Sequence, residues 1–167
     1  MMKIQVGGLS EGVHEYRFHE KASDLGVSGD FQDGIDVEAI LEKTGNQMYL
    51  RARINAIGLF LCDRCLAQFP RGISSTYRMC YMTEGADPGN LDPSEIQRIS
   101  PGNNVIDITE DVRQTAILSV PLKLLCREDC KGLCPYCGKN KNIESCACTG
   151  ATVDSRWEKL RFIRNDN

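Results

Sequence analysis

The sequence contains no long hydrophobic run. Its N-terminus has no apolar stretch of the length found in a signal peptide, and no segment approaches the roughly 18 apolar residues that a membrane-spanning helix needs. We therefore expect a soluble, cytoplasmic protein with no membrane partner. Because structural disulfides do not persist in a reducing compartment, the cysteines are expected to serve metal binding or redox chemistry.

The sequence also lacks the motifs of common catalytic sites. It has only two histidines, His14 and His19, and both fall within an alternating pattern typical of a strand. No glycine-rich phosphate loop, GxSxG elbow or HExxH motif is present. The carboxylates Asp107, Glu110 and Asp111 lie where a helix is expected to begin, and there they are stabilising without any catalytic role. We therefore expect a protein that is not an enzyme and has no small-molecule substrate.

Positive charge is scarce, because the chain of 167 residues has a net charge of −3. A protein that holds nucleic acid mainly by phosphate contacts usually has a clear basic excess. The charge is uneven, however, since residues 84–111 are acidic whereas 123–141 carry five basic residues against two acidic ones. Any contact with an anion is expected in that later segment, although its lysines could equally serve only to solvate a loop.

A β pattern dominates what the sequence does contain. Short strands are predicted over three ranges near the N-terminus, 3–6, 14–19 and 35–41. The clearest alternation of apolar and polar residues covers 48–56, and a similar alternation resumes at 73–81. The CxxC motif at 62–65 lies between these two segments, so it is expected at the tip of an antiparallel hairpin.

Less regular segments and helices complete the predicted elements. Residues 84–104 contain three prolines and several acidic residues, and they are expected to form a long, mobile surface connection. A helix is predicted to begin around Glu110, capped by Asp107 or Thr109, and Pro121 is expected to end it. A second short helix is predicted over 154–163, with apolar residues at helical spacing: Trp157, Leu160 and Ile163.

These elements predict an α+β fold within a single structural domain. The fold would be mostly an antiparallel β-sheet or a partly closed barrel, with a few short helices and a C-terminal cysteine-rich zinc module. Residues 1–121 would form the β-rich body with one helix. Residues 122–150 would form a zinc-binding module packed on that body, and 151–167 a short C-terminal helix.

Eight of the nine cysteines occur in four closely spaced pairs. The spacings are CxxC, CxxxC, CxxC and CxC, formed in turn by Cys62 and Cys65, Cys126 and Cys130, Cys134 and Cys137, and Cys146 and Cys148. Zinc binds four thiolates in tetrahedral geometry, and a CxxC turn directs two sulfurs to one ion. Six cysteines within 23 residues, interleaved with charged residues, cannot be a core segment. The remaining Cys80, on a β face, is interpreted as a small buried hydrophobic residue.

Four pairs predict two zinc ions per chain, and two divisions of the pairs are open. In the division that we favour, the third and fourth pairs form one local site within residues 134–148. The first and second pairs then form another site, which links segments about 60 residues apart. In the competing division, the second and third pairs share one ion. Gly138 can adopt the positive φ that tightens a turn after Cys137, whereas Cys65 lacks a following glycine, so the first turn is the weaker one.

Redox exchange is the main alternative to metal binding, because CxxC motifs also serve disulfide exchange. Such a motif needs its first cysteine at a helix N-terminus, where the thiol pKa is lowered. Cys62 is predicted to follow one strand and precede another, so this support is missing. Catalytic zinc is also disfavoured, since it needs an open coordination position, commonly with histidine ligands, and an all-cysteine site is closed.

The CDRC hairpin at 62–65, the helix ending at Pro121 and the run LCREDCKGLCPYCG at 125–138 together resemble a known family. Over most of its length the sequence is similar to the bacterial large ribosomal RNA subunit accumulation proteins, the YceD-like family. Some members of that family keep the hairpin motif and ligand-type residues at the 126 and 130 positions but lack the later cluster, which supports two separable metal sites. The family's usual Asn-Leu-Asn-type stretch appears here as KNKN at 139–142.

The resemblance implies a role in the accumulation or maturation of large-subunit (23S) ribosomal RNA, with no catalytic residues to carry over. We expect zinc to hold a rigid surface that binds ribosomal RNA, ribosome-assembly proteins, or both. The candidate contacts are basic residues of the cysteine region and the last helix: Lys123, Arg127, Lys131, Lys139, Lys141, Arg156, Lys159, Arg161 and Arg164. The alternatives are a zinc-stabilised protein-interaction module without RNA contact and a thiol redox sensor.

Overall fold

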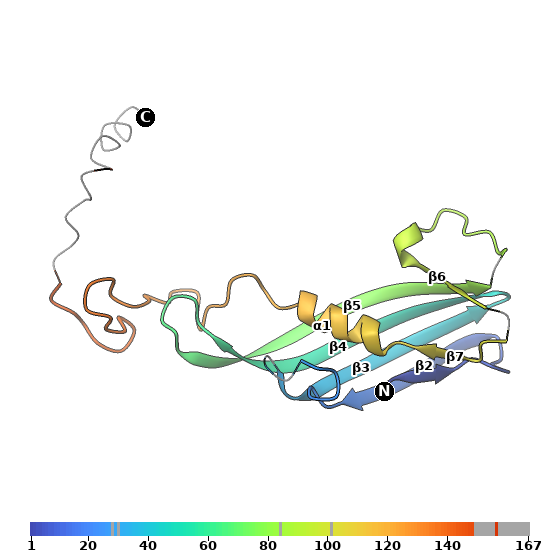
Figure 1. The fold of residues 1–167 in the computed structure, drawn as a ribbon, viewed down its shortest axis with the longest axis horizontal. Helices are drawn as coiled ribbons and strands as arrows, with labels where there is room; N and C mark the ends of the chain where they lie inside the picture. Colours follow the sequence, from blue (N-terminus) through green and yellow to red (C-terminus); the bar gives the residue numbers. More distant parts are fainter. Residues whose placement is uncertain (28, 30, 84, 101, 149–155, 157–167) are drawn as a thin grey trace.

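A five-stranded sheet forms the body of the protein in the computed structural model, which describes residues 1–148 except 28, 30, 84 and 101, together with Arg156. In chain order its strands are β2 (Gly12–Glu20), β3 (Phe31–Thr44), β4 (Gln47–Leu61), β5 (Gln68–Thr83) and β6 (Ile96–Ile99). They follow the same order across the sheet (Figure 1). Neighbours from β2 to β5 are antiparallel, whereas β6 runs parallel to β5.

The long strands arise from the period-two pattern of the sequence. In β4 every second residue from Met48 to Phe60 is buried, because alternate side chains of a strand point to opposite faces. The strands predicted over 14–19, 35–41, 48–56 and 73–81 are confirmed, and the structure extends each of them. The predicted hairpin is confirmed as well, since β4 and β5 pair along their whole length up to Leu61 and Gln68.

The sheet stays open between its edge strands, β2 and β6. Closing it would require these two strands to pair, but β6 pairs only with residues 80–83 of β5. Of the two architectures predicted, the mainly antiparallel sheet is therefore confirmed. A partly closed barrel is not found among the residues that the structure describes.

A small second layer covers one face of the sheet. It consists of β1 (Lys3–Gln5), β7 (Val105–Asp107), which pairs antiparallel with β1, and the helix α1 (Thr109–Leu118) (Figure 1). The strand predicted over 3–6 is thus confirmed. Apolar side chains of this layer pack against those of the sheet to form one core, with Ile4, Ile106, Ile108 and Val112 from the layer and Val37, Leu41, Leu50 and Ile54 from the sheet. Among the described residues, no comparable layer covers the opposite face of the sheet.

The predicted connection over 84–104 is only partly correct. It contains a short 3-10 helix, η1 (Pro93–Glu95), followed by β6. Asp92 caps η1, because its carboxylate accepts a hydrogen bond from the backbone N–H of Ser94 at 2.9 Å. The strand was missed because it has four residues and its support comes from parallel pairing with β5, which local sequence does not reveal.

The helix α1 lies where it was predicted, but its two ends differ from the prediction. Its N-cap is Ile108, which makes no side-chain capping bond, so neither Asp107 nor Thr109 is the cap. The Asp107 carboxylate instead accepts from the backbone N–H of Thr109 at 3.0 Å. The helix ends at Leu118, before Pro121 can limit it.

The cysteine-rich segment 122–148 lies beyond the tip of the β4–β5 hairpin, at the opposite end of the sheet from β6 (Figure 1). The helix predicted over 154–163 falls outside the described residues apart from Arg156. Within the described part of the chain, no helix has the length and apolar character needed to cross a membrane.

Candidate metal centres

The hairpin tip holds Cys62 and Cys65 in a tight turn. The backbone N–H of Leu66 donates to the carbonyl of Cys62, and the N–H of Cys62 donates to the carbonyl of Ala67, both at 2.9 Å. Leu66 adopts a φ of +58°, the left-handed conformation that usually belongs to glycine in such turns. The turn therefore forms although a leucine, not a glycine, follows Cys65.

Residues 124–133 are fastened to this tip at two points. Asp63 and Leu124 are joined by two hydrogen bonds, from the Asp63 N–H to the Leu124 carbonyl at 2.8 Å and from the Leu124 N–H to the Asp63 carboxylate at 2.6 Å. The Leu133 N–H donates to the Arg64 carbonyl at 2.9 Å, and the Arg64 guanidinium donates to the Cys130 carbonyl at 2.8 Å. The two residues between the hairpin cysteines thus position the segment that carries the second cysteine pair.

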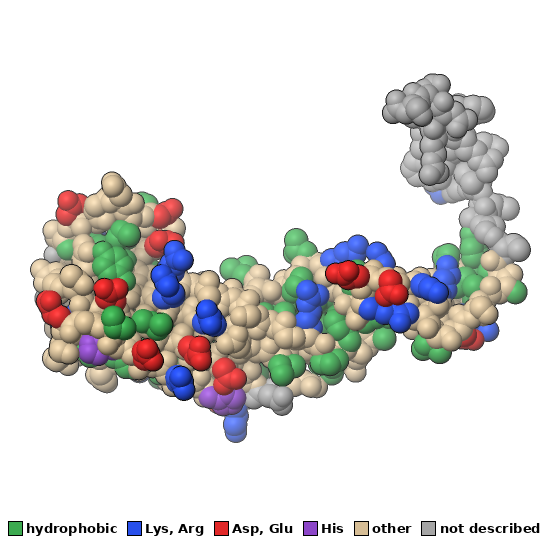
Figure 2. Space-filling view, turned by 180° about the vertical axis from the view of Figure 1, so that it is seen from behind, with side chains coloured by type: hydrophobic (Ala, Val, Ile, Leu, Met, Phe, Trp, Pro, Cys, Tyr) green, Lys and Arg blue, Asp and Glu red, His purple; other side chains and the backbone are tan. Residues whose placement is uncertain are grey.

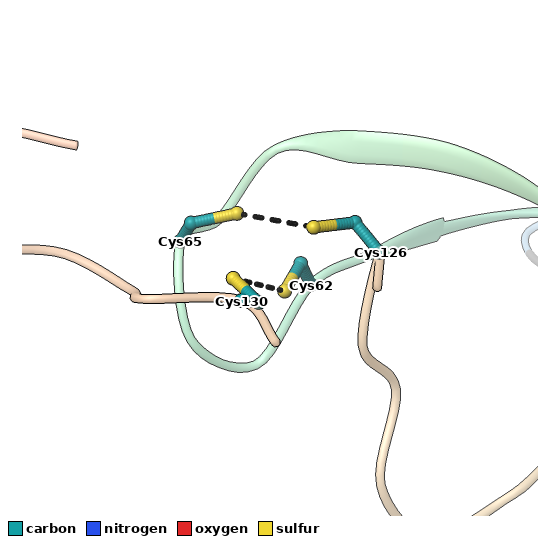
Figure 3. A group of neighbouring side chains, drawn as sticks. All are labelled: Cys62, Cys65, Cys126 and Cys130. Carbon is teal, nitrogen blue, oxygen red and sulfur yellow. Dashed lines mark hydrogen bonds between the residues drawn. The ribbon is translucent and has the colours of Figure 1, made fainter. Parts of the chain in front are cut away.

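The first candidate centre consists of Cys62, Cys65, Cys126 and Cys130, whose sulfurs all lie within 4.8 Å of one another (Figure 3). The Sγ atoms of Cys62 and Cys130 are 3.7 Å apart, as are those of Cys65 and Cys126. A disulfide would need about 2.05 Å. Tetrahedral zinc with Zn–S bonds of about 2.3 Å requires sulfurs about 3.8 Å apart. The two closest sulfur pairs therefore have a spacing compatible with a tetrahedral metal ion, and the four cysteines could hold one.

Hydrogen-bond donors surround the sulfurs of this first centre. Burial raises the pKa of Cys62, but the backbone N–H groups of Cys126, Arg64 and Cys65 outweigh it and lower the pKa to about 6. Burial, with the neighbouring thiols of Cys65 and Cys130, raises the pKa of Cys126 to about 12. Without a metal ion the cluster thus holds both a thiolate and a firmly protonated thiol. A metal ion would have to displace the remaining thiol protons.

The second candidate centre consists of Cys134, Cys137, Cys146 and Cys148, whose sulfurs also lie within 4.8 Å of one another. Its turn repeats the hydrogen bonds of the hairpin tip: the Gly138 N–H donates to the Cys134 carbonyl at 2.9 Å, and the Cys134 N–H donates to the Lys139 carbonyl at 2.8 Å. Gly138 has a φ of +73°, as its sequence position predicted. Cys134 is buried, whereas Cys137 and Cys148 are exposed.

The same electrostatic arrangement recurs at the second centre. The backbone N–H groups of Cys137 and Tyr136 lower the pKa of Cys134 to about 6. The hydrogen bond with Cys137 is the main cause that raises the pKa of Cys148 to about 12, and Cys134 raises the pKa of Cys146 in the same way. In both centres, then, the first cysteine of the CxxC turn is the preferred thiolate.

The two groups follow the division that the sequence favoured. The hairpin pair meets the CxxxC pair, and the last two pairs meet each other. The competing division, with the second and third pairs on one ion, is not the arrangement found. Cys80 stands apart from both groups and is buried, with 2% of its surface exposed, as its position on a β face predicted.

Asn142 connects the two centres, and sequence reasoning missed it. Its side-chain oxygen accepts from the Lys131 N–H and from the Arg127 guanidinium, both at 2.8 Å, and its side-chain nitrogen donates to the Cys130 sulfur at 3.3 Å. Burial raises the pKa of Cys130, but hydrogen bonds from the Asn142 amide, the Gly132 backbone and the neighbouring thiols together lower it. The available signal was the Asn-x-Asn stretch, since Asn140 in turn accepts from the Asn142 amide at 2.8 Å.

Basic side chains gather around both centres, at the end of the molecule where Lys and Arg are frequent in Figure 2. Arg127 pairs with Asp129 at 3.4 Å and Lys139 with Glu144 at 3.1 Å. Lys123, Lys131 and Lys141 are exposed and form no ion pair with another described residue. Part of this positive charge offsets the negative charge that a metal ion with four thiolates would carry. Lys159, Arg161 and Arg164 lie outside the described residues.

The fold and its two four-cysteine groups define a class: an open β-sheet protein in which one cysteine group is built on the tip of a long hairpin and a second group lies in the segment that follows. Residues 50–163 match the model of the family described as large ribosomal RNA subunit accumulation protein YceD. The chain belongs to this family, as the resemblance in its sequence predicted. The match includes β4 from Leu50 onward, all of β5 and α1, and both cysteine groups.

Curated relatives agree with the family match. The chain is 30% identical over 194 aligned residues to an Arabidopsis thaliana protein named large ribosomal RNA subunit accumulation protein YCED homolog 1, chloroplastic; the alignment covers 97% of this chain and 59% of the relative. It is 23% identical to the Zea mays protein of the same name, over 80% of this chain and 57% of the relative. An uncharacterized protein of Mycobacterium tuberculosis is 26% identical over 75% of this chain and 60% of the relative.

The chain spans about six-tenths of the length of these relatives. No solved structure shows a significant match to it.

Proposed function

We propose that this chain is a non-catalytic zinc protein of ribosome biogenesis that promotes the accumulation or maturation of large-subunit ribosomal RNA. The observation that carries the proposal is the family match over 50–163, which spans both cysteine groups. The names of the two plant relatives point the same way. Because the chain is shorter than these relatives, the proposed role is that of the part of the protein that this sequence covers.

Zinc is the metal that the donor set favours. Four thiolates at tetrahedral spacing suit zinc, whereas magnesium and calcium take oxygen ligands. Four cysteines also fill the coordination sphere and leave no position for water or substrate, which supports a structural role for each ion. The thiol redox alternative is disfavoured because sulfurs gather in fours rather than as isolated pairs, and because Cys62 lies between two strands rather than at a helix N-terminus.

The zinc ions would fix the position of the exposed lysines. The bound metal would hold residues 124–133 on the hairpin tip, and this segment with its neighbours carries Lys123, Lys131 and Lys141. Three lysines on one rigid end of the molecule form a site for RNA phosphates. Such binding would weaken steeply with salt, because each neutralised phosphate releases counterions.

A protein partner is a second candidate, and exposed apolar side chains favour it. Leu118 at the end of α1, Leu122 shortly after it, and Ile143 in the loop between Cys137 and Cys146 have at least 83% of their surfaces exposed. Apolar side chains of this kind are typical of protein–protein contacts when they lie together. A zinc-stabilised interaction module without RNA contact would use these residues rather than the lysines.

Salt dependence and matched variants separate the two candidates. In source-organism cells that lack the gene, we expect precursor forms of large-subunit ribosomal RNA to accumulate, with rescue by the wild-type chain. The triple variant Lys123→Gln, Lys131→Gln, Lys141→Gln should fail to rescue if RNA is the partner. The variant Leu118→Ser, Leu122→Ser should fail if it is a protein. Normal ribosomal RNA in cells without the gene would overturn the proposal.

A further inference from the structure

The uncovered face of the sheet carries a hollow at the end opposite the metal centres. It has a volume of about 330 Å³ and lies beneath the segment that leads into β6, which contributes Leu91 and Glu95. The sheet contributes outward-facing residues of three strands: Ile40 and Glu42 from β3, Tyr49 and Arg51 from β4, and Arg78 from β5. Figure 2 shows this face, with apolar, basic and acidic side chains close together beneath the projecting segment. The volume is in the range of a small-ligand site.

Two arginines of the hollow are close neighbours on the sheet. Arg51 and Arg78 are directly opposite each other in the β4–β5 register, so their side chains leave the same face of the sheet side by side. Like charges in this position destabilise a sheet. Both side chains are exposed, and neither forms an ion pair with any residue in the described ranges. The two guanidinium groups can therefore bind an anionic group such as a phosphate through paired hydrogen bonds.

The rest of the hollow does not suit a bare anion. Glu42 lies opposite Tyr49, next to the arginine pair, and Glu95 lines the hollow from the overhanging segment. These two carboxylates would repel a free phosphate, but they can accept hydrogen bonds from the amino groups of a nucleobase. The Tyr49 ring, with 38% of the residue exposed, and Ile40, with 43% exposed, offer a flat apolar surface for stacking.

We propose that this hollow binds one nucleotide of single-stranded RNA, with the phosphate on Arg51 and Arg78, the base against Tyr49, and the base edge towards Glu42 and Glu95. A nucleotide combines an anionic phosphate with N–H donors on a flat ring, which matches the charges of the hollow group by group. The inference rests on the proposed function, because it gives the RNA a second contact besides the lysines near the metal centres. RNA bound at both places would run along the uncovered face of the sheet.

Binding of the full chain to a fluorescently labelled single-stranded RNA tests the site by anisotropy. The double variant Arg51→Gln, Arg78→Gln should weaken binding at least about tenfold and reduce the salt dependence by roughly one phosphate contact, because both arginines bind the same phosphate. Arg17→Gln is the matched control, since it removes one arginine from the same face outside the hollow, and it should change affinity less than about twofold.

Tyr49→Ala should weaken binding about tenfold, whereas Tyr49→Phe keeps the stacking surface and should bind as the wild type does. Circular dichroism and metal content verify that each variant is folded.

Two further measurements identify the ligand. RNA with 4-thiouridine should cross-link on irradiation to the peptide that contains Tyr49. A mononucleotide should compete for the hollow at concentrations where inorganic phosphate and a polyglutamate peptide do not. Equal competition by phosphate or by the peptide would overturn the inference.

The possible failures are distinguishable. If the wild-type chain binds RNA and the lysine triple variant abolishes binding while Arg51→Gln, Arg78→Gln has no effect, the inference is overturned and the proposed RNA contact stands. If the wild-type chain binds no RNA, the inference and the RNA contact both fail. Loss of binding in both sets of variants supports both sites.

Discussion

The two cysteine groups share one local design but differ in what they connect. Each begins with a CxxC turn closed by the same pair of backbone hydrogen bonds. The first group joins the hairpin tip to a segment that follows α1, and its cysteines are largely buried. The second group lies entirely within residues 134–148, and two of its four cysteines are exposed. The comparison teaches that a metal ion can stabilise either a tertiary contact or a local loop, depending on the sequence distance between its ligands.

The largest difference between the two groups is expected when one cysteine is removed from each in turn. Cys62→Ser should abolish the first metal site and lower the free energy of unfolding by several kcal/mol, since structural zinc sites have apparent binding energies on the order of 10 kcal/mol. Hydrogen exchange should then accelerate in residues 124–133 and at the hairpin tip. Cys137→Ser should accelerate exchange within 134–148 alone.

The control for these variants is Cys80→Ala, which replaces a buried cysteine outside both groups and should leave the metal content unchanged. Equal and global destabilisation by Cys62→Ser and Cys137→Ser would contradict the assignment of a long-range and a local site.

Acid should release metal from both groups. Metal binding requires thiolates, so metal-bound cysteines have a lower pKa than metal-free ones; stabilisation by the metal is present at high pH and is lost as pH falls. The metal-free groups keep thiols whose pKa is raised to about 12, at Cys126 and Cys148, and these protons must leave when metal binds. Zinc affinity should therefore fall by about 10-fold to 100-fold for each pH unit between pH 9 and pH 5.

A competing chromophoric chelator measures this decline, and calorimetry in buffers of different ionisation enthalpy counts the protons released. A zinc affinity that stays constant over this pH range would show that the thiols are not the ligands.

The variant Asn142→Ala tests the coupling between the groups. Loss of the amide that donates to the Cys130 sulfur should weaken zinc binding at the first centre by about tenfold or more, which is the usual effect of removing such a partner of a metal ligand. The second centre of the same variant serves as an internal control, because no ligand of that centre bonds to the Asn142 side chain. Weakening of the second centre alone would disprove the connection.

The smallest effect is expected at the residues that follow the two CxxC turns. Leu66→Gly should stabilise the hairpin turn by about 0.5–1 kcal/mol, because a left-handed backbone costs a leucine roughly 1–2 kcal/mol and glycine's greater freedom in the unfolded chain offsets part of the gain. Gly138→Leu should destabilise the second turn by a similar amount. Thermal unfolding of the metal-bound chain measures both, and a destabilising Leu66→Gly would show that the leucine side chain itself supports the tip.

Sequence patterns predicted the sheet and the cysteine groups because both have local signatures. Period-two alternation marks β4 and β5, and short cysteine spacings mark the two groups that could hold a metal. The division into two groups was predicted from the short 134–148 loop, since a compact loop leaves the other two pairs to meet, and the family resemblance supported it.

Features that depend on distant contacts escaped prediction. The strand β6 is supported by parallel pairing with β5, and the Ile108 cap of α1 follows from the pairing of its flanking residues with the N-terminal strand, where the Ile108 N–H donates to the Met2 carbonyl at 3.0 Å. Asn142 gained its role only when residues 139–142 folded back against Cys130. Leu66 adopts a left-handed backbone conformation because the CxxC turn requires it, which the helix or strand propensity of leucine would not indicate.

The central claim is that each group of four cysteines holds one zinc ion. Elemental analysis of the purified full chain, combined with a count of reactive thiols before and after chelation, tests it most directly. We expect two zinc ions per chain and about eight thiols that become reactive only after zinc is removed. One zinc ion would contradict the two-site scheme, and a metal-free chain with freely reactive thiols would contradict the assignment of both centres.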